Sequence, residues 1–448
     1  MNMKKVLILG AGMVARPIIR YLLENGIQVV VASNTPERGE KMIAGHPAGK
    51  NLSWSVEDLP GLESLVRDSD LVVSILPYLF HLKVAATALK YKKDMVTTSY
   101  VKPEMDALDN DAKNAGIIIL NEMGLDPGID HMTAMRIIDT VHRKNGRIEE
   151  FYSLCGALCA PEAATNPFRY KFSWSPKGVV MASNNDAKFL NKGVEVNLPT
   201  EDLFKNPFSI DFPGVGSLEV YPNRDSISYI DIYGIPGVRT IYRGTFRFPG
   251  WCETLDILKK TGMISNDKVN MTGMTYAGLV AFLAGLNNPS DIRQKLAGKL
   301  LIKESSVALE AMQYLGLFDN KPMNRRIDSP FEVTSDLMIE KMMIRDSDRD
   351  LVVMQHIFLA SYPDGKKEVI RSRMLDFGMP GGDTAISRTV ALPAAVGVKL
   401  ILENKIAVKG VYRPVISDIY NPVLDELEKM NIKMTEEYGL PESENLKG

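Results

Sequence analysis

The stretch Lys5-Val-Leu-Ile-Leu-Gly-Ala-Gly-Met-Val-Ala15 decides the fold of this chain of 448 residues. Its first five residues have the apolar pattern of a buried strand, and a helical pattern follows as far as Asn25-Gly26. Between them lies the G-x-G-x-x-A spacing of a dinucleotide-binding turn, where glycines permit a tight turn and close approach to a pyrophosphate, and a helix N-terminus faces the phosphates. We therefore predict a dinucleotide-binding βαβ unit whose cofactor contacts are Gly10, Gly12, Met13, Val14 and Ala15.

Further strand patterns continue through the next hundred residues, with helical patterns between most of them. They fall at 28–32, 51–56, 71–75, 94–98 and 117–120. Alternating strands and helices predict an α/β fold with a Rossmann-type, doubly wound parallel sheet. Because ligands of such sheets bind outside the carboxyl ends of the strands, the residues just after each strand are candidates for contacts. These are Ser33, Asn34 and Thr35, then Ser74, Ile75 and Leu76, then Ser99 and Tyr100, and finally residues 121–126.

The end of the second strand bears on which nicotinamide cofactor binds. An acid there would bind the ribose 2′-hydroxyl and repel a 2′-phosphate, but neither Ser33 nor Asn34 is acidic. The hydroxyls of Ser33 and Thr35, with Arg38 one turn later, suit a phosphate instead. The sequence therefore favours NADP over NAD.

Beyond residue 150 the pattern changes to that of an α+β domain. Strand-like runs occur at 151–156, 226–233, 239–248 and 351–360, and helical runs at 270–286 and 291–317. We predict a Rossmann domain at 1–127 and an α+β substrate domain at 128–383 that carries a helical insertion at about 265–345. A long apolar helix pattern at 383–404 predicts that a segment at about 384–448 rejoins the first domain.

Composition bounds the function classes. The three cysteines suggest no disulfide framework, so a cytoplasmic protein is expected. A formal net charge of −2 gives no electrostatic reason to expect nucleic acid or an anionic membrane as a partner. Cys155 and Cys159 have no further cysteine or histidine near them in the sequence, so no metal site is predicted.

The segment Asn121–His131 offers an acid, Asp126, at the edge of the sheet where the cofactor is expected. An acid at this place favours a hydride-transfer enzyme over a protein that only binds a nucleotide. Asp126-Pro127 also has the sequence of a helix N-cap followed by proline at the first helical position. A capping carboxylate is held ionised and donates protons poorly. Two roles thus stay open for Asp126, a helix cap and a group that carries a proton or positions an amine or water.

Several motifs along the chain resemble the saccharopine dehydrogenases of the NADP-dependent, L-glutamate-forming type, also called saccharopine reductases. The resemblance covers nearly the whole chain, and its most specific motifs are Leu125–Asp130 and Lys171–Ser175. It implies that glutamate condenses with the aldehyde of 2-aminoadipate 6-semialdehyde, and that NADPH reduces the imine to saccharopine. Among the other motifs that carry it are Gly10–Pro17, Ile75–Tyr78, Tyr221-Pro-Asn-Arg-Asp225 and Arg243-Gly-Thr-Phe-Arg247.

The resemblance and the chemistry of saccharopine together indicate site residues. The three carboxylates of saccharopine require fixed cations, for which arginine is best suited. Arg224 and Arg247 match this requirement. Arg243 lies on the same face of the expected strand as Arg247, and the alternative interpretation is that this face is exposed to solvent. The family implies substrate contacts at Ser99, Tyr100, Asp126, Arg224, Thr245, Phe246 and Arg247, catalytic roles for Asp126, Tyr100 and Cys155, and further cofactor contacts at Leu125, Asp126, Pro127 and Ser175. Where the family has an arginine near position 34, this chain has Asn34, and Arg38 is the candidate substitute.

Two other functions stay open at this point. One is carboxynorspermidine dehydrogenase, which reduces an imine formed from a diamine and needs fewer cations. The other is a nucleotide sensor without catalysis, against which the joint presence of Tyr100, Asp126, Arg224 and Arg247 argues. Family analogy further implies a homodimer. The reaction is reversible, and because the sequence lacks the long fused partner domain expected of a bifunctional degradative enzyme, a role in lysine biosynthesis is favoured.

Overall fold

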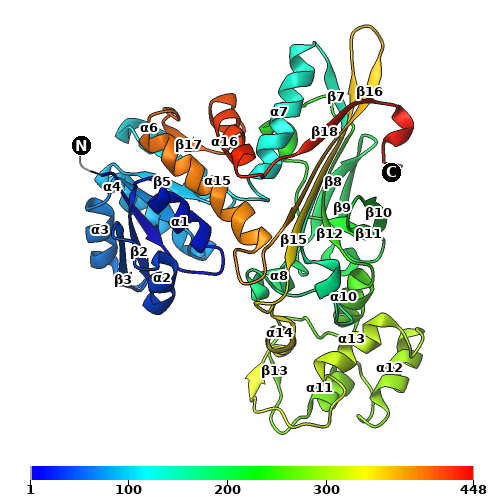
Figure 1. Ribbon diagram of the computed structural model, residues 1–448. Coiled ribbons are helices and arrows are strands. Elements are labelled where there is room, and N and C mark those ends of the chain that lie inside the picture. The colour runs from blue at the N-terminus through cyan, green and yellow to red at the C-terminus, as the bar shows by residue number, and fades with distance from the viewer. Residues whose placement is uncertain (1–2, 447–448) are drawn as a thin grey trace.

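The computed structural model describes residues 3–446. Its first sheet has seven strands in the order β17-β6-β5-β4-β1-β2-β3, and every neighbouring pair is parallel. This confirms the Rossmann-type sheet (Figure 1). The strands are β1 (Lys5–Leu9), β2 (Gln28–Ser33), β3 (Gly49–Ser53), β4 (Leu71–Ser74), β5 (Asp94–Thr97), β6 (Ile118–Leu120) and β17 (Gly410–Tyr412).

Helices cover both faces of this sheet, and the alternation of side chains along β1 shows why. Val6 and Ile8 belong to one apolar core, which they share with α1 and α15, whereas Leu7 and Leu9 belong to another on the side of α3 and α4. Both faces of the strand are therefore buried, as its continuous apolar run predicts. The helices of this region are α1 (Arg16–Glu24), α2 (Pro36–Ile43), α3 (Leu59–Arg67), η1 (Tyr78–Phe80), α4 (His81–Tyr91), α5 (Pro103–Asp106), α6 (Asp109–Ala115) and α15 (Ala385–Leu402).

The second sheet is mixed and has nine strands. Its main order is β10-β11-β12-β7-β15-β16-β18, with β8 and β9 attached beside β12; β12 and β7 are parallel and the other pairs antiparallel. The strands are β7 (Arg147–Cys159), β8 (Ala187–Asn191), β9 (Val194–Leu198), β10 (Phe208–Phe212), β11 (Gly216–Pro222), β12 (Thr240–Arg247), β15 (Asp350–Ser361), β16 (Lys367–Phe377) and β18 (Thr435–Leu440).

Helices accompany the second sheet, and a helical insertion extends from it at the bottom of Figure 1. The insertion holds α11 (Tyr276–Leu283), α12 (Ile292–Leu300), α13 (Val307–Leu315), α14 (Pro330–Met342) and the ribbon of β13 (Val269–Asn270) and β14 (Ile327–Asp328). The other elements are α7 (Ile129–Arg143), η2 (Pro161–Ala163), α8 (Pro176–Ala182), η3 (Thr200–Asp202), α9 (Tyr229–Ile232), α10 (Trp251–Lys260), α16 (Ser417–Lys429) and η4 (Glu442–Glu444).

Two sequence expectations fail in this region. The run at 226–233 is not a strand, because it contains α9, and Tyr229 and Tyr233 lie four residues apart on one buried helical face. The helical run at 291–317 is broken in two, since Leu301 adopts a left-handed conformation with φ of 56° and Ser306 caps the next helix by accepting from the Leu309 N–H.

The C-terminal segment crosses between the two sheets. α15 packs on α1, and β17 adds to β6 in the first sheet, whereas β18 pairs with β16 in the second. Residues 435–440 of the segment expected to rejoin the first domain thus belong to the second sheet. Within residues 3–446, α15 alone is long and apolar enough to cross a membrane, and 78% of it is buried inside the protein, as in a core helix.

Candidate active site

The glycine turn after β1 has the geometry that a dinucleotide requires. Gly10 has a φ of +110°, and a Cβ there would lie 3.1 Å from the Ile75 carbonyl oxygen, so only glycine fits. Gly12 is exposed, and a Cβ added to it would meet nothing within 4 Å. Ala15 is fully buried at the start of α1, Val14 is half-buried and Met13 is exposed. Open space therefore lies beside the backbone where a pyrophosphate would bind.

The end of β2 presents polar side chains without an acid. The buried Ser33 hydroxyl accepts the Thr35 N–H at 3.3 Å, while Asn34 and Arg38 are exposed. The Arg38 guanidinium forms no ion pair with the described residues. It is therefore free to meet an anion at this edge of the sheet.

His81, which no motif in the sequence marks as functional, joins the ends of β4 and β5. His81 lies 2.8 Å from the Ser74 hydroxyl through Nδ1 and 2.7 Å from the Ser99 hydroxyl through Nε2. Burial lowers the pKa of His81 to about 4, so the ring is neutral and orients both hydroxyls. Ile75 and Leu76 follow β4 half-buried. In the sequence, the feature that points to His81 is its position at the start of α4, shortly after β4.

Tyr100 and Asp126 are in contact, and Arg243 joins them. The Tyr100 hydroxyl donates to Asp126 Oδ1 at 2.8 Å, and Arg243 Nη2 donates to the same oxygen and, at 3.1 Å, to the Tyr100 oxygen. Arg243 Nη2 also lies 3.2 Å from Asp130 Oδ2. Arg243 is buried, so the reading of a solvent-exposed arginine is wrong. Asp126 Oδ2 accepts no hydrogen bond from any residue in the range 3–446.

The reading of Asp126 as a helix cap is also wrong. α7 begins at Ile129 with Gly128 at the N-cap, and it is Asp130 that accepts the Gly128 N–H, at 2.6 Å. Asp126 instead directs its carboxylate to Tyr100 and Arg243. Its neighbours Leu125 and Pro127 are buried.

Arg247 is the last residue of β12, four residues after Arg243, and its surroundings differ from those of Arg243. It is buried, and its Nη1 donates to the Phe246 carbonyl at 2.8 Å. Its guanidinium lies over the rings of Tyr170, Trp251 and Tyr221, at 5.1, 5.2 and 5.9 Å from their centroids. No carboxylate pairs with it within the part of the chain that the structure describes, and its Nε has no hydrogen-bond partner there. A buried cation without an anion indicates an anionic ligand.

Cys155 lies on β7 between the two arginines, paired in register with Thr245. Burial, and then the carboxylates of Asp126 and Asp130, raise the pKa of its thiol well above the ordinary value. Burial likewise raises the pKa of the Tyr100 phenol. Both groups therefore stay protonated near neutral pH, and Cys155 is no thiolate nucleophile.

The remaining predicted residues lie at different depths. Arg224 is exposed, with a left-handed φ of 53°, and its guanidinium lies 5.6 Å from the Tyr100 ring centroid. Thr245 is half-buried, whereas the Phe246 side chain is fully buried against Phe212, and the Phe246 carbonyl accepts a hydrogen bond from Arg247. Ser175 is exposed at the start of α8 and makes no hydrogen bond to the other predicted residues.

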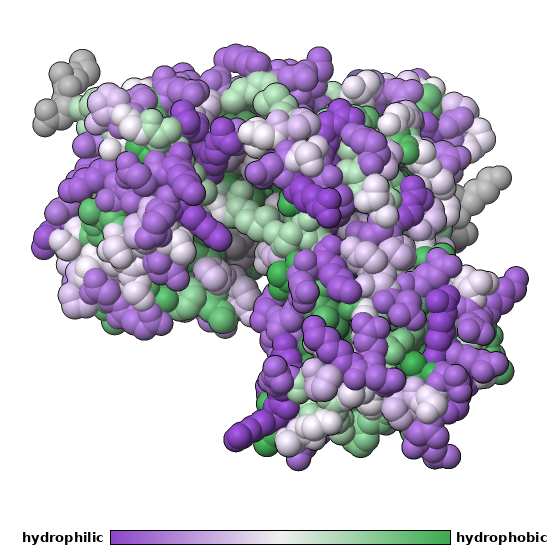
Figure 2. Space-filling model, turned by 60° about the horizontal axis from the view of Figure 1, so that its bottom comes forward, coloured by the Kyte–Doolittle hydropathy of each residue, from purple (hydrophilic) through white to green (hydrophobic). Residues whose placement is uncertain are grey.

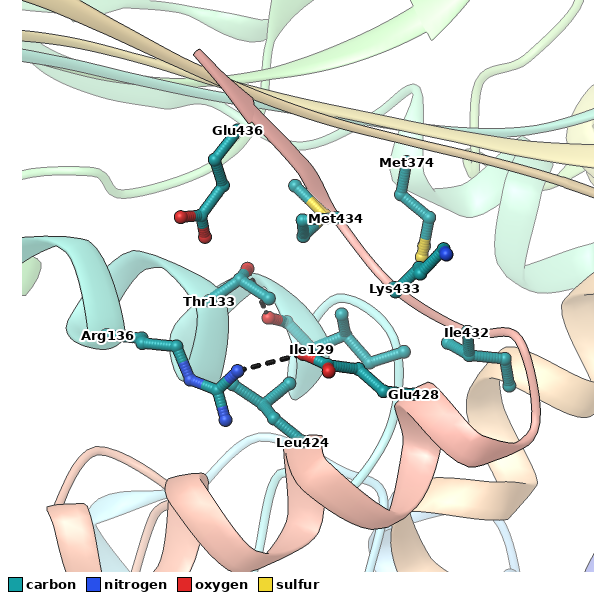
Figure 3. A pocket seen from close by; sticks show the side chains of 10 residues that line it. All are labelled: Ile129, Thr133, Arg136, Met374, Leu424, Glu428, Ile432, Lys433, Met434 and Glu436. Carbon is teal, nitrogen blue, oxygen red and sulfur yellow. Dashed lines mark hydrogen bonds and ion pairs between the residues drawn. The ribbon is translucent and has the colours of Figure 1, made fainter. Parts of the chain in front are cut away.

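Figure 2 shows the surface hollowed between the first domain, at left, and the second, at right. A separate cavity of about 20 Å³, room for about one water, lies where α7 meets α16 and the strand segment after it (Figure 3). Arg136 and Glu428 form an ion pair of 3.0 Å in its wall. Among residues 3–446, no group of three or more His, Cys, Asp or Glu side chains is arranged to hold a metal ion.

Comparison with known proteins gives matches over nearly the whole chain. Residues 6–120 match the saccharopine dehydrogenase NADP binding domain, and residues 124–432 match the saccharopine dehydrogenase C-terminal domain. The chain is 37% identical to saccharopine dehydrogenase [NADP(+), L-glutamate-forming] of Pyricularia oryzae, over 97% of this chain and 99% of that protein. It is 36% identical to mitochondrial alpha-aminoadipic semialdehyde synthase of Bos taurus, over 96% of this chain and 47% of that protein.

A solved structure is also similar throughout. It is the apo saccharopine dehydrogenase (L-Glu forming) from Saccharomyces cerevisiae, which matches with a TM-score of 0.89 at 34% identity. The match covers 97% of this chain and 99% of that one.

Proposed function

The chain belongs to the saccharopine dehydrogenase family, and we propose that it condenses L-glutamate with 2-aminoadipate 6-semialdehyde and reduces the imine to saccharopine. NADPH supplies the hydride. The aldehyde oxygen leaves as water, and the reaction takes up one proton as the substrate ammonium becomes the secondary ammonium of the product. The reaction is reversible, so the same residues serve both directions.

The observation that carries this proposal is Arg247, a buried cation without a protein carboxylate. Saccharopine bears three carboxylates, and arginine's planar fork suits one of them. The aromatic rings around the guanidinium keep it in place and exclude water, which strengthens the attraction to an anion. Arg224, exposed beside the Tyr100 ring, is the second cation for a substrate carboxylate.

Asp126 holds the reacting nitrogen in this proposal, and Tyr100 holds Asp126. The free Asp126 Oδ2 accepts an N–H of the substrate amine, while Oδ1 stays occupied by Tyr100 and Arg243. Tyr100 keeps its proton near neutral pH and donates it as a hydrogen bond. Asp126 therefore positions the amine and the departing water, and the ion pair with Arg243 fixes its orientation.

The cofactor is NADP(H), bound through the domain matched at residues 6–120. We assign the 2′-phosphate to Ser33, Thr35 and the unpaired Arg38 at the end of β2. Arg38→Ala should raise the Kd for NADPH and leave that for NADH unchanged, as measured by quenching of protein fluorescence. An equal loss for both cofactors would place the phosphate elsewhere.

The test of the reaction is NADPH oxidation in the presence of both substrates. Turnover is expected with L-glutamate plus 2-aminoadipate 6-semialdehyde, with saccharopine identified by mass spectrometry. A diamine with aspartate semialdehyde should give none, and turnover with that pair alone would overturn the proposal. The carboxynorspermidine dehydrogenase and nucleotide-sensor alternatives receive no support from the relatives described above.

The relatives described above also support a proposal for the cellular role. We propose that the enzyme is a cytoplasmic homodimer that serves lysine biosynthesis, in keeping with similarity to the fungal enzyme over 99% of its length. Light scattering on the purified protein tests the dimer. Growth without lysine of a fungal strain that lacks its own saccharopine dehydrogenase, after expression of this chain, tests the role.

A further inference from the structure

Behind Arg243 lies a second layer of buried charged residues, centred on His131. The His131 ring is fully buried, with Nε2 2.8 Å from Glu122 Oε2 and Nδ1 2.6 Å from the Tyr233 hydroxyl. Nδ1 also lies 3.7 Å from Asp130 Oδ2, the oxygen that faces Arg243. His131 therefore stands between two acids, one of which contacts the arginine that holds Asp126.

Without His131, the charges of this network do not balance. Three carboxylates, from Glu122, Asp126 and Asp130, face two arginines, Arg243 and Arg413. Arg413 also pairs at 3.1 Å with Asp106, whose side chain is 49% exposed, so Arg413 supplies no surplus positive charge. Arg413 Nε lies 3.2 Å from Glu122 Oε1, and the side chains of Glu122 and Asp130 are 3% and 0% exposed. An uncompensated buried charge is strongly unfavourable. One further proton is therefore needed among these side chains. Burial raises the pKa of Asp130, but one of its oxygens accepts the Gly128 N–H and the other faces Arg243 and His131, contacts that suit a carboxylate, so the proton is assigned to His131.

The other titratable groups around His131 do not supply that charge. Tyr229 stacks on the ring at 5.4 Å and Tyr233 bonds to it, and burial raises the pKa of both phenols, which stay neutral. His356, on β15, is neutral because burial lowers its pKa to about 3. Burial alone would lower the pKa of His131, but the carboxylates of Asp130 and Glu122 outweigh it and raise that pKa.

We propose that His131 is a positioning residue whose positive charge balances Glu122, Asp126 and Asp130 and thereby keeps the Asp126–Arg243 pair aimed at the substrate amine. The proposal rests on the proposed function, because it concerns how that reaction's carboxylate is held. Glu122 belongs to the loop after β6, and Tyr233 is the residue directly after α9 in the second domain. The network consequently spans the junction between the domains at the site of reaction.

The kinetic test uses His131→Gln and the double variant His131→Gln/Glu122→Gln. Wild-type turnover is measured first, since its absence would defeat the proposed function and not this inference. His131→Gln leaves one excess negative charge, so the remaining carboxyl groups take up a proton more readily. The acid limb of the kcat/KM profile should move up by about one to three pH units. Removing the Glu122 charge as well should return the limb toward its wild-type position.

Compensation separates charge balance from a merely structural role. If His131 only fills space and bonds its neighbours, the double variant should be worse than the single one, and that result would overturn the proposal. His356→Gln is the matched control, because it removes a buried neutral histidine bonded to Thr133 at 2.8 Å. It should leave the acid limb in place.

A second measurement does not depend on activity. The chain has five histidines, and ¹⁵N-histidine spectra of the wild type and His131→Gln identify the signals of His131 by difference. We expect the two ring nitrogens to show the imidazolium signature at pH 7. A neutral ring at that pH would overturn the proposal even if the variant were inactive.

Discussion

Arg243 and Arg247 lie four residues apart on β12, both buried, yet their surroundings differ in kind. Arg243 meets the carboxylates of Asp126 and Asp130, which come from the segment between the two domains. Arg247 meets three aromatic rings and a carbonyl, and no carboxylate of residues 3–446. The charge of Arg243 is paired with carboxylates of the chain, whereas that of Arg247 has no such pair among the described residues.

The difference separates scaffold from binding group. A paired arginine fixes the position of its partner and gains little from a ligand. An unpaired buried arginine carries a desolvation penalty that an incoming carboxylate relieves. Arg243 in the middle of β12 thus holds Asp126, and Arg247 at the end of the strand receives the substrate.

The largest expected effect is on the paired side, at Asp126. Asp126→Asn keeps the shape but removes the charge that faces Arg243 and the acceptor for the substrate amine. We expect kcat to fall by about 10²-fold, because the loss of correct positioning of a reacting group alone costs about that much. NADPH affinity should stay the same, as measured by fluorescence titration. A variant with full kcat would remove Asp126 from the reaction.

Stability provides the most direct test of the comparison. Arg243→Met leaves Asp126 and Asp130 buried without their partner, which should lower the free energy of unfolding by about 3–5 kcal/mol. Arg247→Met leaves no carboxylate without its partner, so the free energy of unfolding should be unchanged or slightly higher. Urea unfolding of both variants measures the difference. Equal losses would mean that the two arginines are held alike.

Substrate affinity should respond on the unpaired side. Arg247→Lys keeps a charge but loses the planar fork, and a charged hydrogen bond contributes about 1.5–3 kcal/mol, which corresponds to about a ten- to hundredfold change. We expect KM for saccharopine to rise by that factor with kcat little changed. Steady-state kinetics in the direction of saccharopine oxidation measure it. If kcat fell and KM did not change, Arg247 would act on the reaction itself.

A smaller effect on kcat is expected at Tyr100, which donates a hydrogen bond to Asp126. Tyr100→Phe removes one hydrogen bond to Asp126, and kcat should fall by about tenfold or less. Burial raises the pKa of Tyr100 well above its ordinary value, so the phenol does not ionise in the assay range. The alkaline limb of the pH–rate profile should therefore coincide in the variant and the wild type. A limb that disappears in the variant would identify Tyr100 as the titrating group.

The smallest effect is expected at Cys155, between the two arginines. Its raised thiol pKa leaves almost no thiolate at neutral pH. Cys155→Ala should change kcat by less than about threefold, since it removes only a weak donor. Iodoacetamide should leave wild-type activity intact at pH 7. Rapid inactivation with protection by saccharopine would show a reactive thiol.

Much of the first domain could be predicted because its signals are local. The apolar run at Lys5–Leu9, the glycines after it and the alternation of elements appear in the structure almost residue for residue. The strand expected at 226–233 failed because tyrosines and isoleucines suit both strands and helices. Asp126-Pro127 misled in part because the helix after it starts later, at Ile129.

The sequence by itself determined the nucleotide-binding half and the pair of arginines that share a face of β12. The alternation of side chains along a strand predicts which of them share a face, and the glycine spacing predicts where the backbone can approach a phosphate. Only the tertiary structure decided that this face is buried and what covers it. Arg243 reaches Asp126 and Asp130 across separations of 117 and 113 residues, and His81 reaches Ser99 across 18. Such contacts depend on how elements pack, which no local pattern specifies.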